Sequence, residues 1–454
     1  MKRNKTLTTL LKKEFESISW PFKEFIRDQK TSNYLLIIAT ILSIFLANSY
    51  WSELFTEYNN SMSGFYIGGW VFEMSNQDWI NNALMTLFFY VIGLEIKREL
   101  LAGELVSFRI NLTILAAALG GMIFPALIYY FLNVGEVGVR GWGIPMATDT
   151  AFAVGVLALL SHRIPIAVTT FLTALAIFDD IGAVLVIAFF YINELHIEYL
   201  YQAAFIFFIL LGMNYLGVRT SIPYLLGGIF LWFAIHASGI HAAISGILAA
   251  MTVPAKPKHE PGWFITKTLY LLRKFKRLEQ QTGKKYHILA KQKEHDVISD
   301  IERVAETSTT PLQRWEQTVR RPITLFILPL FALSNAGIPI NLEVLPETLK
   351  SYEFWGIFLG LVLGKCLGIS LCAWLILKTG FADLPKNVTM QHIIGIGLLG
   401  GMGFTMSIFI AGIGFSELNL TLINAKTAIL AGSLVAGILG YLWMYWISRK
   451  PSSH

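Results

Sequence analysis

The chain has 454 residues, of which 54% are hydrophobic and only 15% are charged. Soluble domains carry about 25% charged residues, so this composition excludes an ordinary soluble protein and indicates a protein embedded in the lipid bilayer. The formal net charge of +6 could suggest nucleic acid. An excess of Lys and Arg in cytoplasmic loops explains it more simply, and we expect no nucleic-acid partner.

Apolar runs long enough to cross about 30 Å of hydrocarbon recur along most of the chain. We therefore predict an all-α integral membrane protein with twelve transmembrane helices, at residues 33–49, 79–96, 110–132, 143–160, 167–191, 200–218, 222–236, 239–253, 322–338, 353–377, 392–413 and 424–447. The expected segments are a cytoplasmic N-terminal segment over 1–32 with an amphipathic helix within 7–26, spans one to eight over 33–253, a basic cytoplasmic loop over 254–321, spans nine to twelve over 322–448 and a cytoplasmic tail over 449–454.

The charges of the loops indicate how the spans are oriented. The loop 50–78 contains no Lys or Arg, and the loops on its side of the membrane hold only Arg140, Lys350 and Lys426. The loop 254–321 on the other side carries 15 Lys and Arg against 8 Asp and Glu. Because Lys and Arg accumulate in cytoplasmic loops, both termini are expected in the cytoplasm.

Ionisable residues inside the expected spans are few, so each one is informative. They are Asp149 in span four, the adjacent Asp179 and Asp180 in span five, and Lys365 in span ten. One acidic residue at the centre of a membrane helix costs roughly 2.5–3.5 kcal/mol on insertion scales. Three acids and one lysine therefore indicate a water-accessible polar cavity. The economical arrangement pairs one aspartate with Lys365 and leaves the other free for a passing ion.

A carboxylate in such a cavity can hold either a proton or a metal cation, because burial and a like-charged neighbour favour its protonated form. A site that holds one or the other becomes an exchanger when it faces the two sides of the membrane in turn. We expect Asp179 and Asp180 to bind Na+ or Li+ transiently, and we expect no cofactor. Alternatively, the two aspartates are structural groups between helices, and Lys365 is a structural partner of one of them. No catalytic nucleophile–His–acid set or metal-hydrolase motif appears, so we expect a transporter and not an enzyme.

Two stretches predict interrupted helices. Residues 141–152 read GWGIPMATDTAF, where Pro145 lacks a backbone donor and the polar residues Thr148, Asp149 and Thr150 compete for backbone hydrogen bonds. Residues 397–407 read GLLGGMGFTMS, and this density of glycine weakens a helix. Broken helices at corresponding positions of two repeats are the best sequence pointer to a transport site. Ordinary flexibility or close helix packing is the alternative for each stretch.

Five segments carry a resemblance to a known family: VIGLEIKREL (91–100), GWGIPMATDTAFAVGVLALL (141–160), FLTALAIFDDIGAVLVIAFFY (171–191), GKCLGIS (364–370) and GLLGGMGFTMSIFI (397–410). Through them the sequence resembles the NhaA-type sodium/proton antiporters of bacterial inner membranes, over nearly the whole chain apart from the N-terminal region and much of 255–310. The resemblance implies an inverted-repeat antiporter fold in which the interrupted spans 4 and 11 cross. It also implies an electrogenic exchanger for sodium and pH homeostasis, with protons entering as Na+ or Li+ leaves.

The resemblance also implies roles for individual residues. Asp180 matches the principal cation and proton carrier, and Asp179 matches a second carboxylate that can pair with the lysine at Lys365. Asp149 and Thr148 match residues at the crossing of the two broken helices. Glu95, Arg98 and Glu99 match a cytoplasmic cluster linked to pH activation, and His241 matches a histidine also implicated in the pH response.

The family commonly forms homodimers, partly through a β-hairpin in the first outer loop, for which residues 64–75 could serve. One departure lies at the end of the long basic loop, where Gln317 and Arg320 stand in place of familiar histidines beside a retained acid, Glu316. Any pH sensing by those histidines is therefore not carried over. Two other functions stay open: Na+-coupled symport of a small solute, which would need a larger pocket for that solute, and a channel or non-transporting sensor.

Overall fold

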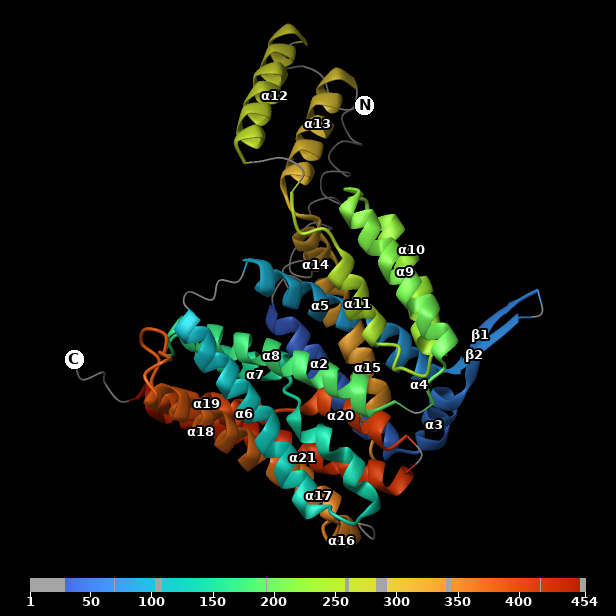
Figure 1. Cartoon of the computed structure of the whole chain (residues 1–454), viewed down its shortest axis with the longest axis vertical. Coiled ribbons are helices and arrows are strands. Elements are labelled where there is room, and N and C mark those ends of the chain that lie inside the picture. Colours follow the sequence, from blue (N-terminus) through green and yellow to red (C-terminus); the bar gives the residue numbers. More distant parts are fainter. Residues whose placement is uncertain are drawn as a thin grey trace, which may run out of the picture.

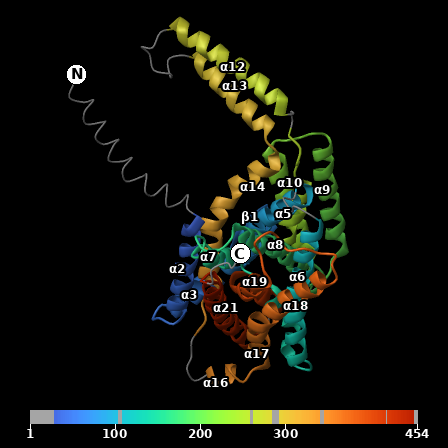
Figure 2. The same cartoon turned by 90° about the vertical axis from the view of Figure 1, so that its left-hand side faces the viewer.

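The computed structural model describes residues 29–68, 70–102, 108–192, 194–257, 261–282, 292–339, 345–416 and 418–449. The chain is mostly helical, and the described residues contain one two-stranded sheet (Figures 1 and 2). The amphipathic helix expected within residues 7–26 lies outside the described residues.

The elements in chain order are α2 (Gln29–Ala47), α3 (Ser52–Asn60), β1 (Met62–Ile67), β2 (Trp70–Ser75), α4 (Asn76–Asp78), η1 (Trp79–Leu84), α5 (Met85–Ala102), α6 (Phe108–Leu132), η2 (Val137–Met146), α7 (Thr150–Ala158), α8 (Ile166–Phe190), α9 (Ile197–Tyr215), α10 (Ser221–Ala237), α11 (Ile244–Thr252), α12 (Pro261–Thr282), α13 (Gln292–Ser308), α14 (Pro311–Pro322), η4 (Ile323–Ile327), α15 (Leu328–Asn335), α16 (Leu345–Thr348), α17 (Tyr352–Leu359), η5 (Gly360–Gly364), α18 (Lys365–Lys378), α19 (Met390–Gly400), α20 (Phe404–Gly414) and α21 (Asn419–Ser448). The η2 segment is a 3₁₀-helix, and the other η segments are single π-helical stretches.

Within the described residues, six helices are long and apolar enough to cross a membrane, or up to eight if each of two bent helix pairs is one span. The bent pairs are α2 with α3, at 111°, and α19 with α20, at 47°. Helices also occupy the other expected spans, but several are short or broken: α11 has nine residues, and the expected span 143–160 is divided between η2 and α7. The count of twelve spans stays a prediction.

Close helix contacts through glycine hold the centre of the bundle together. A side chain at Gly368 of α18 would collide with the backbone oxygen of Gly120 in α6, and one at Gly120 would collide with that of Gly368. Further along the same pair of helices, a Cβ at Gly364 would lie 2.8 Å from the Cα of Pro125. The small residues repeated along 356–364 therefore let α6 approach the chain that carries Lys365.

Two hairpins extend from the helical bundle. Strands β1 and β2 pair antiparallel, with Phe65 opposite Phe72, which agrees with the hairpin expected over residues 64–75. Helices α12 and α13 pack against each other around a small core of Leu271, Val297 and Val304. Figures 1 and 2 show α12 and α13 beyond α14, at one end of the molecule.

Candidate functional site

The first interruption in the bundle lies between η2 and α7, at residues 147–149. The chain is extended at Ala147 and at Asp149, so the backbone leaves the helical path on both sides of Thr148. Asp149 caps α7, because its Oδ1 accepts a hydrogen bond of 3.2 Å from the backbone N–H of Phe152. A carboxylate at this position satisfies an otherwise unpaired donor and interacts favourably with the positive end of the helix.

The second interruption, between α19 and α20, lies directly against the first. The backbone N–H of Asp149 donates to the carbonyl oxygen of Met402 at 2.6 Å. In return, Asp149 Oδ2 accepts hydrogen bonds from the backbone N–H and the hydroxyl of Thr405, at 3.1 and 2.5 Å. Ser407 Oγ donates to the carbonyl of Ile144 at 2.8 Å. Polar groups released by one break are therefore satisfied by the other.

A buried ion pair lies beside this contact. Lys365 Nζ is 2.6 Å from Asp179 Oδ2, and the two residues are 0% and 1% exposed. Thr148 Oγ1 accepts from Lys365 at 2.9 Å and lies 2.7 Å from Asp179 Oδ2 and 3.0 Å from the carbonyl of Gly400, to one of which it donates. The other oxygen of Asp179, Oδ1, is buried without a hydrogen-bond partner among the described residues. Such an atom is costly unless a ligand or water satisfies it.

Asp180, the next residue of α8, has a different environment from Asp179. Its side chain is only partly buried and forms no hydrogen bond or ion pair within the part of the chain that the structure describes. The charges that act on it are those of Asp179, Glu95, Asp149 and Lys365. The two adjacent acids thus differ: Lys365 holds one of them, and the other has no such partner among the described residues.

The family model described as Na+/H+ antiporter 1 matches residues 23–444. The chain belongs to this family.

Among its relatives, the Na+/H+ antiporter NhaA of Sulfurimonas denitrificans is 39% identical over 96% of this chain and 98% of its own length. The Na+/H+ antiporter NhaA 2 of Psychromonas ingrahamii is 42% identical over 98% of this chain and 93% of its own length. The Na+/H+ antiporter NhaA of Acidithiobacillus ferrooxidans is 43% identical, covering 95% of this chain and 98% of the relative. These matches confirm the resemblance to NhaA-type antiporters.

This NhaA-family chain also has a charged cluster where α5 meets α14. Arg98 lies 2.6 Å from the carboxylate of Glu316, 3.1 Å from that of Glu99 and 3.7 Å from that of Glu95. Arg320 joins Glu95 at 3.1 Å and Glu316 at 2.8 Å. Glu316 is 3% exposed, so this cluster is a partly buried link between the two helices and not a set of independent surface charges.

His241 does not lie in the charged cluster with Glu95, Arg98 and Glu99. Its ring packs against Phe409 of α20 at a centroid distance of 5.1 Å, and its Nδ1 accepts from the backbone N–H of Ala243 at 3.3 Å. Phe409 in turn packs against Phe89, about two helical turns from Glu95 along α5. The four residues expected to respond to pH therefore occupy two places in this NhaA-family protein.

Several residues of the site lie outside the set that the sequence predicts. Thr405 and Ser407 lie in the glycine-rich motif 397–407, and their hydroxyls next to a predicted break were the available signal. Lys365, which the sequence does predict, follows directly after the π-helical stretch η5, a distortion that often occurs at functional sites. Arg320 is a departure from the family in the sequence, and its spacing of four residues from Glu316 is the signal that indicates an ion pair.

Proposed function

We propose that this protein exchanges internal Na+ for external protons across the bacterial inner membrane. The single observation that carries the proposal is the contrast between Asp179, held by Lys365, and Asp180, which has no partner among the described residues. Membership of the Na+/H+ antiporter 1 family supports the same activity. Li+ is proposed as a second transported cation, because it is a small, hard ion that also suits carboxylate oxygens.

In this mechanism Asp180 carries either the proton or the cation. When Asp180 is ionised, its two oxygens and the unsatisfied Oδ1 of Asp179 offer hard ligands for Na+. Protonation of Asp180 removes its charge and expels the cation, so the two ions compete for one site. We further propose that exchange is electrogenic, and that the ion pair between Lys365 and Asp179 breaks and forms again during the cycle.

The two helix breaks provide a hinge for such a site. We propose that the chain has twelve spans in inverted repeats, that spans 4 and 11 are the interrupted spans, and that they cross where Asp149 meets Thr405. Asp149 and Thr148 would hold this crossing in register. Half-helix ends at membrane depth need such polar partners, because no bulk water is present to satisfy them. Movement of one repeat against the other would expose the aspartates to each side in turn.

The charged cluster and His241 are proposed to adjust the exchanger to pH. Glu95, Arg98 and Glu99 would act through α14, whose Glu316 and Arg320 complete the cluster.

We also propose that both termini are cytoplasmic, that two copies associate through the β1–β2 hairpin, and that transport needs no cofactor. Symport of an organic solute is less well supported, because the polar pocket beside α3, α15 and α21 is not lined by Asp179 or Asp180.

The test uses the purified full-length protein in proteoliposomes with an acidic interior and a pH-sensitive dye inside. Adding Na+ or Li+ outside should raise the internal pH, because protons leave as the cation enters, whereas choline should not. A membrane-potential dye should report net charge movement in the same assay. If neither Na+ nor Li+ dissipates the gradient at any pH over roughly 6–9, where shifted carboxylates titrate, the antiport proposal fails.

A further inference from the structure

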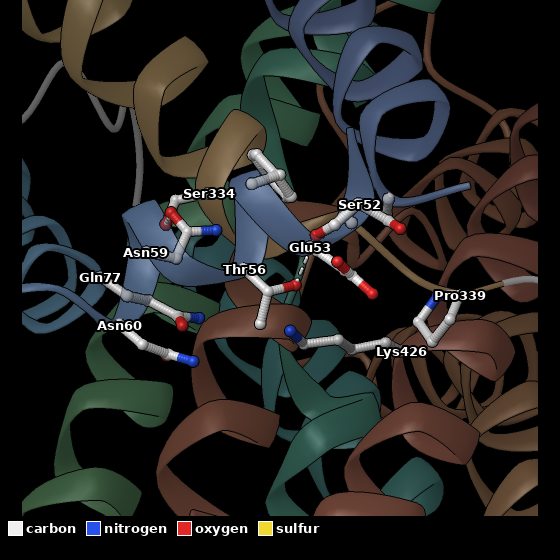
Figure 3. Close-up of a pocket in the computed structure, with 12 residues that line it drawn as sticks. Ser52, Glu53, Thr56, Asn59, Asn60, Gln77, Ser334, Pro339 and Lys426 are labelled. Atoms are coloured by element: carbon white, nitrogen blue, oxygen red, sulfur yellow. Dashed lines mark hydrogen bonds between the residues drawn. The ribbon is translucent and has the colours of Figure 1, made fainter. Parts of the chain in front are cut away.

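A polar pocket of about 580 Å³ lies away from the ion pair, at the base of the β1–β2 hairpin. Its polar lining comes mainly from the short helix α3, with Gln77 of α4, Ser334 of α15 and Lys426 of α21 beside it (Figure 3). Its volume is within the range of about 300–1,000 Å³ that is typical of small-molecule sites. None of the residues assigned to exchange contributes to its lining.

The floor of the pocket is formed by Lys426 of α21. This residue is only 9% exposed, yet its ammonium group forms no hydrogen bond or ion pair with any residue that the structure describes. Burying an ammonium group without a partner costs several kcal/mol, so such a group is normally neutralised or bound. In Figure 3 the ammonium group points into the pocket, beneath Thr56. The pocket therefore has a positive group aimed at whatever occupies it.

The remaining polar groups are arranged on two sides of Lys426. Asn60 and Gln77 face its ammonium end from one side in Figure 3, and Glu53 lies on the other side, at the rim. Asn59 accepts a hydrogen bond from Ser334 Oγ through its Oδ1, at 3.1 Å, so its amide N–H group is left to face the pocket. The lining thus offers donors near Lys426 and one carboxylate further out.

We propose that this pocket binds a small zwitterionic solute from the side of the membrane on which the β1–β2 hairpin lies. The carboxylate of the solute would meet Lys426 and the amide groups of Asn59 and Asn60, and its cationic end would face Glu53. A simple anion would be repelled by Glu53 and a simple cation by Lys426, so the paired opposite charges favour a dipolar molecule.

The experiment measures binding of radiolabelled glycine betaine to the full-length protein in nanodiscs, by equilibrium dialysis at constant ionic strength. A ligand of about eight non-hydrogen atoms is expected to bind with a dissociation constant in the millimolar range. Acetate and tetramethylammonium, which carry the two charges separately, should each bind at least tenfold more weakly, roughly the penalty for one lost charge contact. The proposal would be overturned if acetate bound as tightly as glycine betaine, or if glycine betaine did not bind.

Variants distinguish the site from nonspecific binding. Lys426→Met and Glu53→Gln should each weaken binding about tenfold or more, whereas Lys350→Met, on an exposed lysine outside the pocket, should leave it unchanged. Lys426→Met should also leave the ligand-free protein at least as stable as wild type in thermal unfolding, because it removes a largely buried residue's charge that has no partner among the described residues. Unchanged binding in Lys426→Met overturns the proposal. So does a favourable Lys426–Glu53 coupling in a double-mutant cycle without ligand, because Glu53 would then already be the partner of the ammonium group.

Discussion

Lys365 Nζ lies 2.6 Å from Asp179 Oδ2 in the buried centre of the bundle, and the carboxylate of the next residue, Asp180, has no such contact among the described residues. Residues one position apart on a helix point about 100° apart, so a single lysine on α18 can bind one of the two acids and leave the other free. The adjacent acids are therefore not equivalent. Their difference in partners is the structural basis of the proposed exchange.

Loss of Lys365 should destabilise the protein as well as stop transport. Lys365→Ala removes one partner of a buried ion pair and leaves the charge of Asp179 buried without compensation. Such a change lowers the free energy of unfolding by roughly 3–5 kcal/mol. Thermal unfolding in detergent should show this loss, and Lys365→Met combined with Asp179→Asn should recover part of it. Lys378→Ala, at the exposed end of the same helix, is the matched control. A Lys365→Ala variant with normal stability and normal exchange would contradict the pairing.

The contact between the two interruptions should depend on the hydroxyl of Thr405. Thr405→Val keeps the size of the side chain but removes the 2.5 Å hydrogen bond to Asp149. We expect a loss of about 1.5–3 kcal/mol, as for hydrogen bonds to charged groups, together with a lower maximal exchange rate. Thr405→Ser, which retains the hydroxyl, should restore most of both. If Thr405→Val and Thr405→Ser behave alike in thermal unfolding and exchange, this hydrogen bond does not hold the crossing.

Close packing of α6 on α18 should be sensitive to a single methyl group. In Gly368→Ala the new Cβ would meet the backbone oxygen of Gly120, which cannot move as a flexible side chain could. Overpacking of this kind destabilises by about 1–3 kcal/mol. Gly412→Ala on α20 is the control, because no atom lies within 4 Å of its added Cβ. Equal melting temperatures for the two variants would show that α6 and α18 are less tightly packed than described.

The charged cluster should become pH-sensitive when Arg320 is replaced by histidine. Burial opposes the charge of Arg320, but Glu95 and Glu316 outweigh that effect and raise its pKa above the ordinary arginine value. Arg320 therefore stays charged at every physiological pH. A histidine between the same two acids would have a pKa above its unfolded value of about 6.5.

The sign of the effect follows from that shift. The histidine would contribute stability fully below its unfolded pKa, and this contribution would be lost as the pH rises through its higher folded-state pKa. The melting temperature of Arg320→His relative to wild type should therefore fall between about pH 6 and pH 8. Arg321→His, at an exposed neighbouring position, should show no such trend. A parallel pH dependence in the two variants would mean that Arg320 does not bridge the acids in solution.

The sequence predicts most of the helices, because apolar runs and loop charges follow directly from the thickness and polarity of the bilayer. It also predicts breaks near Asp149 and within the glycine-rich stretch 397–407. It leaves open which aspartate pairs with Lys365 when the residues are considered alone, since both Asp179 and Asp180 can border one cavity; only the family resemblance favours Asp179. The answer depends on how α18 sits against α8, which is a property of tertiary packing.

Long-range partners were the least predictable part of the structure. The glycines along 356–364 predict a close helix neighbour but not that this neighbour is α6. Arg320 lies at the end of a long polar loop, and nothing local in that loop indicates that Glu95 on α5 is its partner. Lys426 appears in the sequence as one of few cations on its side of the membrane. Only the packing of α21 shows that it is buried.

The central claim is that Asp180 is the group for which Na+ and protons compete. Its most direct test measures Na+-dependent proton flux in proteoliposomes of wild type, Asp180→Asn and the surface control Asp300→Asn, over roughly pH 6–9. We predict flux in wild type and in Asp300→Asn. Their apparent KM for Na+ should rise about tenfold for each unit by which the pH falls, once protons saturate the site. Asp180→Asn should fold normally and show no flux. Sustained Na+-dependent flux in Asp180→Asn, or a KM for Na+ that does not change with pH in wild type, would contradict the account.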